Sequence, residues 1–419
     1  MITKLLNHQK LIKRYFSYVG VITLMIFIIS SNKAWLYHDD KPIDKIPEKI
    51  PFMWQYDTDA ASWLYRGADL PLYLSDKLQP NIASTRPLFP LLVFLFTKTF
   101  GLFLKYMFSL NAFQLAAIGY IILKLCLYTI SGILMVHTIK KHTNESVALL
   151  AVALLFFHRT SMMSISTFHN YELEFLTPII VVSLFQLLCD SYSTKKNIFY
   201  SAIVGILMLG RPNYAVYLAV LGFVISRRLY KKAVFSCVIQ FVPLLIWILF
   251  LKVFGISYTQ WSLSETAEFR SQFLQSHPIE IIQVFITHLR MYIQNISSFY
   301  GIWIFLAAFG LAIFKSPFKH HILNFSIIFL GTTWFQTFIV YQYKMKTRMM
   351  ADLSILVFGF AAYMVYYLIR RLTSKSQKRI VMGILVGWLF INVIMWVRIP
   401  WIHPFDQKGL YREVPSQYK

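Results

Sequence analysis

Charged residues are scarce in this sequence, and that shortage limits the classes of protein it can form. Only 14% of the 419 residues are charged, and 18 residues are Asp or Glu. A soluble domain carries roughly 25% charged and about 45–50% apolar residues, whereas 57% of this chain is hydrophobic. Apolar runs recur along nearly the whole chain, and a water-soluble core cannot hold so many of them. A membrane protein is therefore predicted.

Cysteines and period-two patterns are also scarce. The three cysteines, Cys126, Cys189 and Cys237, share no C-x-x-C spacing, which argues against a disulfide framework or a zinc site and favours small core residues. Runs such as 179–188 lack the alternation of membrane β-strands, so helices are expected. No small-x-small cleavage site follows the apolar stretch 16–29, which predicts an uncleaved first helix.

Positive charge, in contrast, is plentiful. The formal net charge is +23, and the Lys and Arg residues form short clusters between the apolar runs rather than one block. Dispersed clusters of this kind are typical of membrane topology signals and of contacts with anionic membrane lipid. No nucleic acid partner is predicted.

The apolar runs predict an all-α polytopic membrane protein, a single membrane-embedded domain over residues 1–419 with about eleven transmembrane helices. With the amino terminus in the cytoplasm every inner loop is basic, as the positive-inside rule requires, and the carboxyl-terminal tail 398–419 lies outside. The predicted spans lie at about 16–31, 111–138, 146–162, 175–190, 197–210, 213–226, 233–254, 299–314, 322–340, 352–369 and 380–397.

Two long segments lie on the outer side in this topology, a first outer loop at 32–110 and a second outer segment at 255–298. A span at 87–109 would invert every later loop, so an interfacial or half-buried amphipathic helix is predicted there. In the second segment, two stripes predict a helix lying on the membrane or on the protein's own flank. The apolar stripe contains Ile282, Ile286, Leu289, Ile293 and Ile296, and the polar stripe contains Glu280, Gln283, Thr287, Arg290 and Gln294.

Two features of the sequence point to chemistry. Asp57 and Asp59 lie two residues apart at the start of a probable helix, which favours a general base, with or without a divalent metal ion. The alternative is a helix N-cap and a solvated loop charge. Lys124 falls inside a predicted span, where a charge costs roughly 2.5–3.5 kcal/mol, so its side chain is expected to face the bundle interior or a wet cavity.

Several short motifs follow one another on the predicted outer face. Asp59 precedes Trp63 by four residues, and a stretch Arg86-Pro87-Leu88-Phe89-Pro90 comes later in the same loop. Glu172 and Glu174, an Arg211-Pro212 turn and the basic turn 344–348 come next. Over about residues 10–370 this order resembles the GT-C superfamily of membrane glycosyltransferases, more specifically the branch with protein O-mannosyltransferases and lipid A aminoarabinose transferases. In size and layout the chain also resembles O-antigen glucosyltransferases.

The resemblance implies an inverting glycosyltransferase with a GT-C-like bundle and its site on the outer face of the cytoplasmic (inner) membrane. The donor would be a sugar on polyprenyl phosphate, undecaprenyl phosphate in bacteria. The acceptor would be a hydroxyl of a surface glycan such as the O-antigen of lipopolysaccharide, of lipid A or of a protein. The residues implied are Asp59 or Asp57 as base, Arg86, Arg211, Arg348, Lys346 and Lys344 for the donor phosphate, Glu172, Glu174 and His169 for acceptor or metal, and Trp63 for stacking on the sugar.

Structural interpretations and other functions stay open at this point. Arginines at span ends can snorkel to lipid headgroups, and Glu172 and Glu174 can cap a span. A polysaccharide polymerase would also place arginines at the outer face. A transporter or flippase of lipid-linked glycans would carry charged residues in mid-span and paired repeats. The sequence has a mid-span Lys124 but no internal repeat.

Overall fold

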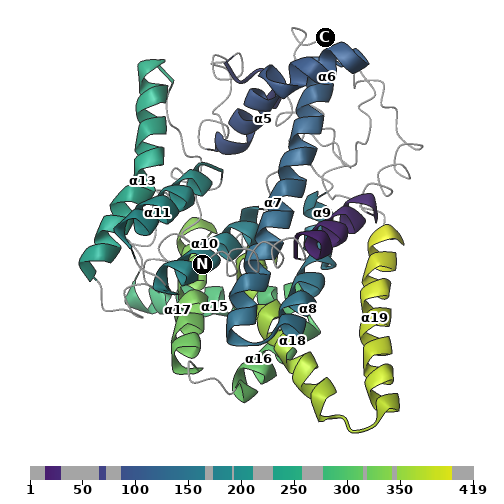
Figure 1. Cartoon of the computed structure of the whole chain (residues 1–419). Coiled ribbons are helices and arrows are strands. Elements are labelled where there is room, and N and C mark those ends of the chain that lie inside the picture. Colours follow the sequence, from purple (N-terminus) through teal and green to yellow (C-terminus); the bar gives the residue numbers. More distant parts are fainter. Residues whose placement is uncertain are drawn as a thin grey trace.

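The protein is described by a computed structural model that covers residues 15–29, 66–71, 86–165, 173–190, 193–210, 230–256, 277–314, 319–341 and 347–398 (Figure 1). Of these residues 92% are helical and none is in a strand, as predicted. Three segments are long and apolar enough to cross a membrane, namely Gln114–His142, Lys231–Val253 and Met350–Arg371. The number rises to five if each of two bent helix pairs is one span, and about eleven spans stays a prediction.

Two asparagines start the long helical hairpin at the centre of the fold. Asn111 caps α7 (Ala112–His142) in a capping box with Gln114, whose backbone N–H donates to the Asn111 side chain over 2.8 Å. Asn144 caps α8 (Glu145–Phe156) through its side chain, which accepts a hydrogen bond from the Val147 backbone N–H. Because only two residues separate the helices, α8 packs back against α7.

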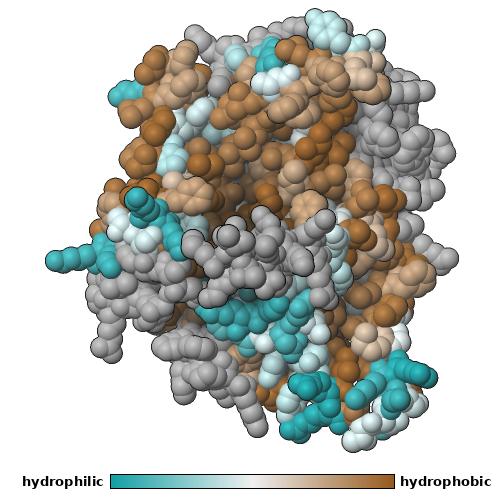
Figure 2. All heavy atoms as spheres, in the orientation of Figure 1, coloured by the Kyte–Doolittle hydropathy of each residue, from teal (hydrophilic) through white to brown (hydrophobic). Residues whose placement is uncertain are grey.

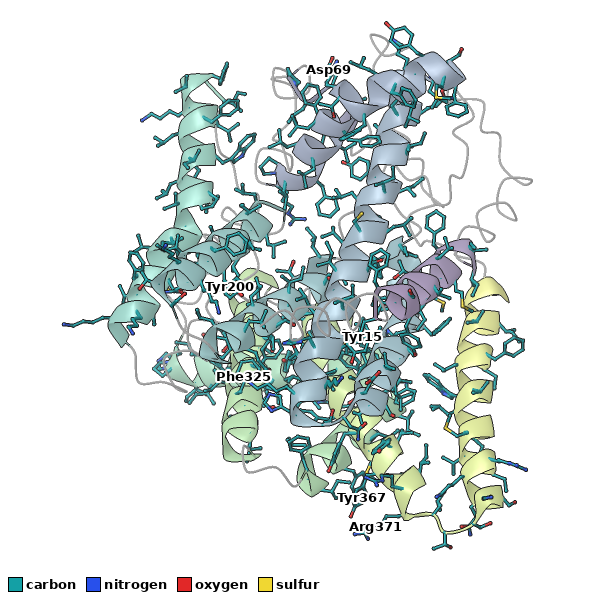
Figure 3. All side chains as sticks on the ribbon, viewed as in Figure 1. Tyr15, Asp69, Tyr200, Phe325, Tyr367 and Arg371 are labelled. Carbon is teal, nitrogen blue, oxygen red and sulfur yellow. The ribbon has the colours of Figure 1, made fainter. Side chains whose placement is uncertain are left out.

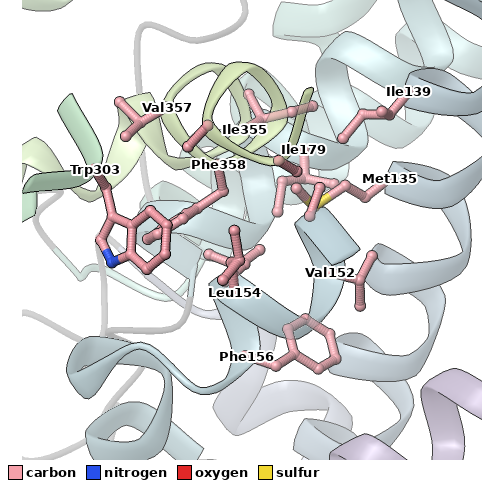
Figure 4. Packing of buried hydrophobic residues seen from close by; sticks show 14 of the residues in the cluster. Met135, Ile139, Val152, Leu154, Phe156, Ile179, Trp303, Ile355, Val357 and Phe358 are labelled. Carbon is pink, nitrogen blue, oxygen red and sulfur yellow. The ribbon is translucent and has the colours of Figure 1, made fainter. Parts of the chain in front are cut away.

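The core lies where α10, α16 and α18 meet α7 and α8. Buried apolar side chains of α7, α8, α10, α16 and α18 interdigitate there (Figure 4). The further elements are α9 (Arg159–Ile165), α10 (Leu173–Asp190), α11 (Thr194–Gly210), α13 (Tyr230–Val253), α15 (Pro278–Tyr300), α16 (Ile302–Ile313), α17 (Lys319–Tyr341), the 3₁₀ helix η1 (Thr347–Leu353), α18 (Ser354–Arg371) and α19 (Lys375–Arg398).

Glycines let two helix pairs approach closely. A Cβ at Gly310 of α16 would lie 2.1 Å from the Phe360 carbonyl oxygen of α18, and one at Gly205 of α11 would lie 2.4 Å from the Gln240 carbonyl oxygen of α13. Small residues at such crossings are typical of helix packing in membranes. There the close approach of two backbones gives van der Waals contact, which stabilises the pair in place of the hydrophobic effect.

The periphery of the fold is strongly apolar. Large apolar side chains of α13 and α19 point outward, among them Val253 (81% exposed) and Ile384 (66% exposed). Brown, hydrophobic atoms cover most of the face in Figure 2, and hydrophilic atoms gather toward its lower edge. An apolar exterior of this extent is what lipid-facing helices require.

Two predicted continuous helices are broken in the structure. Residues 87–109 form α5 (Leu88–Lys98) and α6 (Phe100–Phe108), bent by 55° at Thr99. The Thr99 hydroxyl donates to the Leu95 carbonyl oxygen over 2.8 Å, a back-bond that competes with the helical ladder and bends helices. One face of α5 is buried, in agreement with the half-buried helix predicted there.

The second break falls within the span predicted at 146–162. Here α8 ends at Phe156 and α9 begins at Arg159, and the Ser161 hydroxyl of α9 donates to the Leu155 carbonyl oxygen of α8 over 2.6 Å. The prediction that Cys126 is a core residue is also wrong. Its side chain is exposed, because the buried face of α7 carries Tyr120, Lys124 and Tyr128 instead.

Candidate functional site

Most of the residues predicted for the site lie outside the described part of the chain. For Glu174, in the first turn of α10, and Arg348, in η1, the backbone alone is described. Arg86 is described in full and is half-buried directly before α5. The predicted residues outside the described part are Asp57, Asp59, Trp63, His169, Glu172, Arg211, Lys344 and Lys346.

The structure nevertheless brings three of the predicted motifs together through their described neighbours. Gly210 is the last described residue before Arg211, and Leu173 stands between Glu172 and Glu174. A Cβ at Gly210 would lie 2.7 Å from Leu173 Cδ1 and 3.2 Å from Leu88 Cδ2. The end of α11 therefore meets the starts of α10 and α5, where Arg86 lies two residues before Leu88. The sequence predicts all three of these ends on the outer face.

A second arginine of the first outer loop lies buried at the same place. Arg66 is 5% exposed and precedes Gly67, where a Cβ would lie 2.6 Å from Val93 of α5 and 3.1 Å from Tyr120 of α7. Ala68, Phe89, Tyr120 and Leu173 form one buried apolar cluster. The segment around Arg66 is thus wedged between α5, α7 and the start of α10.

Lys124 extends this region one helical turn along α7. Its side chain is 2% exposed, and its ammonium donates to the Ser164 carbonyl oxygen over 2.8 Å. One turn further, the Tyr128 hydroxyl donates to the Ser161 carbonyl oxygen over 2.8 Å. Both bonds tie α7 to α9. The prediction that Lys124 faces the bundle interior is confirmed.

Arg66, Arg86 and Lys124 are called the cation locus from here on. They come from three separate segments, the stretch 66–71, the start of α5 and the middle of α7. The only carboxylate on these described segments is Asp69, which is exposed and lies beside α5 and α6 (Figure 3). The locus thus holds three side chains of one charge sign in an apolar bundle. Its apolar surroundings lower the local dielectric constant and strengthen attraction for an anion.

A different polar group lies deeper in the bundle and is called the tyrosine locus. The Tyr300 hydroxyl of α15 donates to the Met350 carbonyl oxygen of η1 and contacts Ser354 Oγ at 3.1 Å. The Tyr292 hydroxyl lies 2.6 Å from Thr333 Oγ1 of α17. Asp352 is 8% exposed and interacts electrostatically with both tyrosines.

The two loci lie on two sides of the first turns of α10. Leu173 belongs to the apolar cluster around Tyr120, and Leu176 belongs to the core cluster that contains Met350 and Leu353 of η1. Sequence reasoning missed Arg66 and Asp352 as site residues. Two signals were present in the sequence. Arg66 lies in the first outer loop, which contains the family-like motifs, and Asp352 is a single acidic residue at the first position of a predicted apolar span.

The ends that the sequence predicts on the cytoplasmic side gather elsewhere. Lys140 near the end of α7 donates to the Tyr15 hydroxyl and forms an ion pair with Glu145 at 3.3 Å. His142 Nε2 lies 3.1 Å from Gln186 Oε1 near the end of α10. In Figure 3, Arg371 at the end of α18 lies at the opposite edge of the molecule from Asp69. The two sets of helix ends are therefore separated in space.

Among the residues that the structure describes, no group of three His, Cys, Asp or Glu side chains could hold a metal ion. The acidic pair Asp57 and Asp59, for which a metal was considered, lies outside them. The described site thus offers a group of three cations and a separate network of hydroxyls near a carboxylate. The chain matches no protein-family model, and no curated protein is significantly similar to it.

Proposed function

We propose that this protein is an inverting glycosyltransferase of GT-C architecture with about eleven spans in the cytoplasmic membrane, the amino terminus inside and the site on the outer face. It takes a sugar from polyprenyl phosphate, undecaprenyl phosphate in bacteria. It transfers the sugar to a hydroxyl of a surface glycan such as the O-antigen of lipopolysaccharide, of a lipid or of a protein.

The cation locus is the observation that carries this proposal. The locus combines positive charge with burial in an apolar bundle, and ionisable residues at membrane depth mark binding sites or ion paths. A lipid phosphate matches both properties of the locus, because its tail stays in the bilayer while its phosphate needs fixed cations. The guanidinium groups of Arg66 and Arg86 offer paired N–H donors that fit phosphate oxygens.

The reaction follows from this placement. A hydroxyl oxygen of the acceptor attacks the anomeric carbon, the bond from that carbon to the phosphate oxygen breaks, and the lipid phosphate leaves with the electron pair. The hydroxyl proton passes to a carboxylate, for which Asp59 and Asp57 are the candidates. The cation locus stabilises the negative charge that grows on the leaving phosphate, which is where fixed charges accelerate the step.

A transfer assay in membranes tests the proposal. Membranes that contain the full chain receive a labelled polyprenyl-phosphate sugar, and the glycosidic product is measured. Arg86→Gln is expected to lower the transfer rate by about 100-fold or more, because one donor to the developing charge is lost. Lys98→Gln is the matched control, since Lys98 lies on α5 too but is exposed and rests over the Phe94 ring.

Separate Asp57→Asn and Asp59→Asn variants test the base. Full activity of both variants would remove the two candidates and leave the transfer without its proposed proton acceptor. Equal activity of Arg86→Gln and Lys98→Gln would remove the cation locus from the reaction.

The buried Lys124 also favours a second candidate, a transporter or flippase of lipid-linked glycans. An ammonium in the middle of a candidate span is a common feature of transport pathways. The same assay separates the two functions, because a flippase moves the labelled lipid across the membrane and forms no glycosidic product.

A further inference from the structure

Helix α15 presents three distinct faces, and two of them are exposed. One face, with His288, Tyr292 and Ile296, is buried against the rest of the protein. A second face is apolar and open, with Ile282, Ile286 and Ile293 exposed by 58%, 62% and 56%. A third face carries the predicted polar stripe, all of whose members, Glu280, Gln283, Thr287, Arg290 and Gln294, are exposed.

These faces decide between the two positions that the sequence allowed for this helix. The apolar stripe does not lie on the protein's own flank, because only its last member, Ile296, is buried. A crossing of the bilayer is unfavourable too. Arg290 directly follows the central residue of the 23-residue helix and would sit near the bilayer midplane, where exposed Arg costs roughly 2.5–3.5 kcal/mol.

The orientation of the next helix, α16, indicates how α15 is oriented relative to the membrane. The chain bends by 99° between α15 and α16 at Gly301, whose φ of 53° suits glycine. Helix α16 packs along α18, with Trp303 near its start against Phe358 and Phe314 just past its end against Tyr363. Because α18 lies within the candidate span Met350–Arg371, a helix perpendicular to α16 runs close to the membrane plane.

We propose that α15 lies in the interface of the lipid bilayer, with its isoleucine stripe among the upper acyl chains and its polar stripe in water. The next helix, α16, is apolar and exposed as well, with Ile302, Phe305 and Phe309 exposed by 59%, 62% and 59%. An apolar surface next to a lipid-facing helix and bordered by charged residues matches a headgroup boundary. The occupant of this surface is membrane lipid.

Helix α15 also contacts the interior of the helix bundle. Its buried face carries Tyr292 and Tyr300 onto Thr333, Met350 and Ser354, so the interfacial helix anchors α17 and η1. The inference does not depend on the proposed transferase activity, since it rests on exposure, charge and the bend alone.

Spin-label depth measurements test the placement. In a full-length variant with Cys126, Cys189 and Cys237 replaced by Ser, single cysteines are introduced at positions 282, 286 and 293, and at 283, 287 and 294 on the polar stripe. Each labelled protein is reconstituted in vesicles of phosphatidylcholine and phosphatidylglycerol. Accessibility is then measured to dissolved oxygen, which concentrates in lipid, and to a water-soluble nickel complex.

The three apolar positions are expected to share one shallow depth and to favour oxygen, while the three polar positions favour nickel. If α15 spanned the bilayer, depth would change by about 16 Å between positions 282 and 293. If another protein covered the stripe, labels at 282, 286 and 293 would be immobile and shielded from both reagents. Either result overturns the inference. Exposed Cys at 384 on α19 serves as the matched lipid-facing control, because Ile384 is 66% exposed.

Discussion

The cation locus and the tyrosine locus are both polar groups inside an apolar bundle, but they are built differently. In the tyrosine locus the hydroxyls of Tyr292 and Tyr300 meet Thr333, Ser354 and a backbone carbonyl group within the protein. In the cation locus three positive charges come together from segments that carry one carboxylate, the exposed Asp69. A network of hydroxyl and carbonyl partners within the protein holds a fold together, whereas cations in a low-dielectric site attract a ligand of the opposite charge.

Lys124→Met should separate the two roles most clearly. Methionine fills a similar volume, and it carries none of the desolvation cost of a buried ammonium, which offsets the lost hydrogen bond to Ser164. We therefore expect an unchanged or higher melting temperature but a fall in sugar transfer of about 100-fold, because a cation near the phosphate is lost. Both quantities are measured on the same purified protein.

Lys105→Met is the control for this experiment, since Lys105 is an exposed lysine on the neighbouring helix α6. A large loss of stability in Lys124→Met with normal activity per folded molecule would assign Lys124 to the scaffold. The contrast between the loci would then disappear.

Tyr300→Phe is expected to give the opposite pattern. The substitution removes one hydroxyl and leaves the buried Met350 carbonyl group without that donor, which costs about 1–3 kcal/mol in buried sites. Thermal unfolding in detergent should occur at a lower temperature, while transfer per folded molecule stays the same. A selective loss of activity with unchanged unfolding would place Tyr300 in the reaction instead of the fold.

The sequence predicted the helices and several of these polar positions, but it did not predict how they meet. Apolar runs locate α7, α8 and α10, because hydrophobic length is a local property. The break at Thr99 and the 99° bend at Gly301 depend on single backbone conformations within apolar runs, so hydropathy does not reveal them. Lys124 could be flagged from its position alone. The burial of Arg66 and Asp352 was revealed only by tertiary packing. In the sequence, Arg66 looks like an ordinary residue of an outer loop, and Asp352 looks like an ordinary residue at a span boundary.

Gly67→Ala tests whether the segment of Arg66 must sit deep between α5 and α7. A methyl group at position 67 would come within 2.6 Å of Val93 and 3.1 Å of Tyr120, so the segment has to shift outward. We expect transfer to fall by about tenfold through misplacement of the Arg66 guanidinium. Gly331→Ala on α17 is the matched control, because its Cβ meets nothing within 4 Å. Equal behaviour of the two variants would show that this segment tolerates displacement and has no positioning role.

The pair Tyr292 and Thr333 provides the finest test of the tyrosine locus. Their hydroxyl oxygens lie 2.6 Å apart and join α15 to α17. Hydrogen bonds between helices in membrane proteins contribute about 0.6 kcal/mol on average, less than the loss expected for Tyr300→Phe. A double-mutant cycle with Tyr292→Phe and Thr333→Val should therefore give a coupling energy of about that size in unfolding. Because Asp352 interacts with Tyr292 electrostatically, the cycle repeated in an Asp352→Asn background should give a different coupling energy if the carboxylate polarises the pair. A coupling of zero in both backgrounds would reduce the tyrosine locus to packing, and the internal network would no longer explain why this polar group, unlike the cation locus, belongs to the fold.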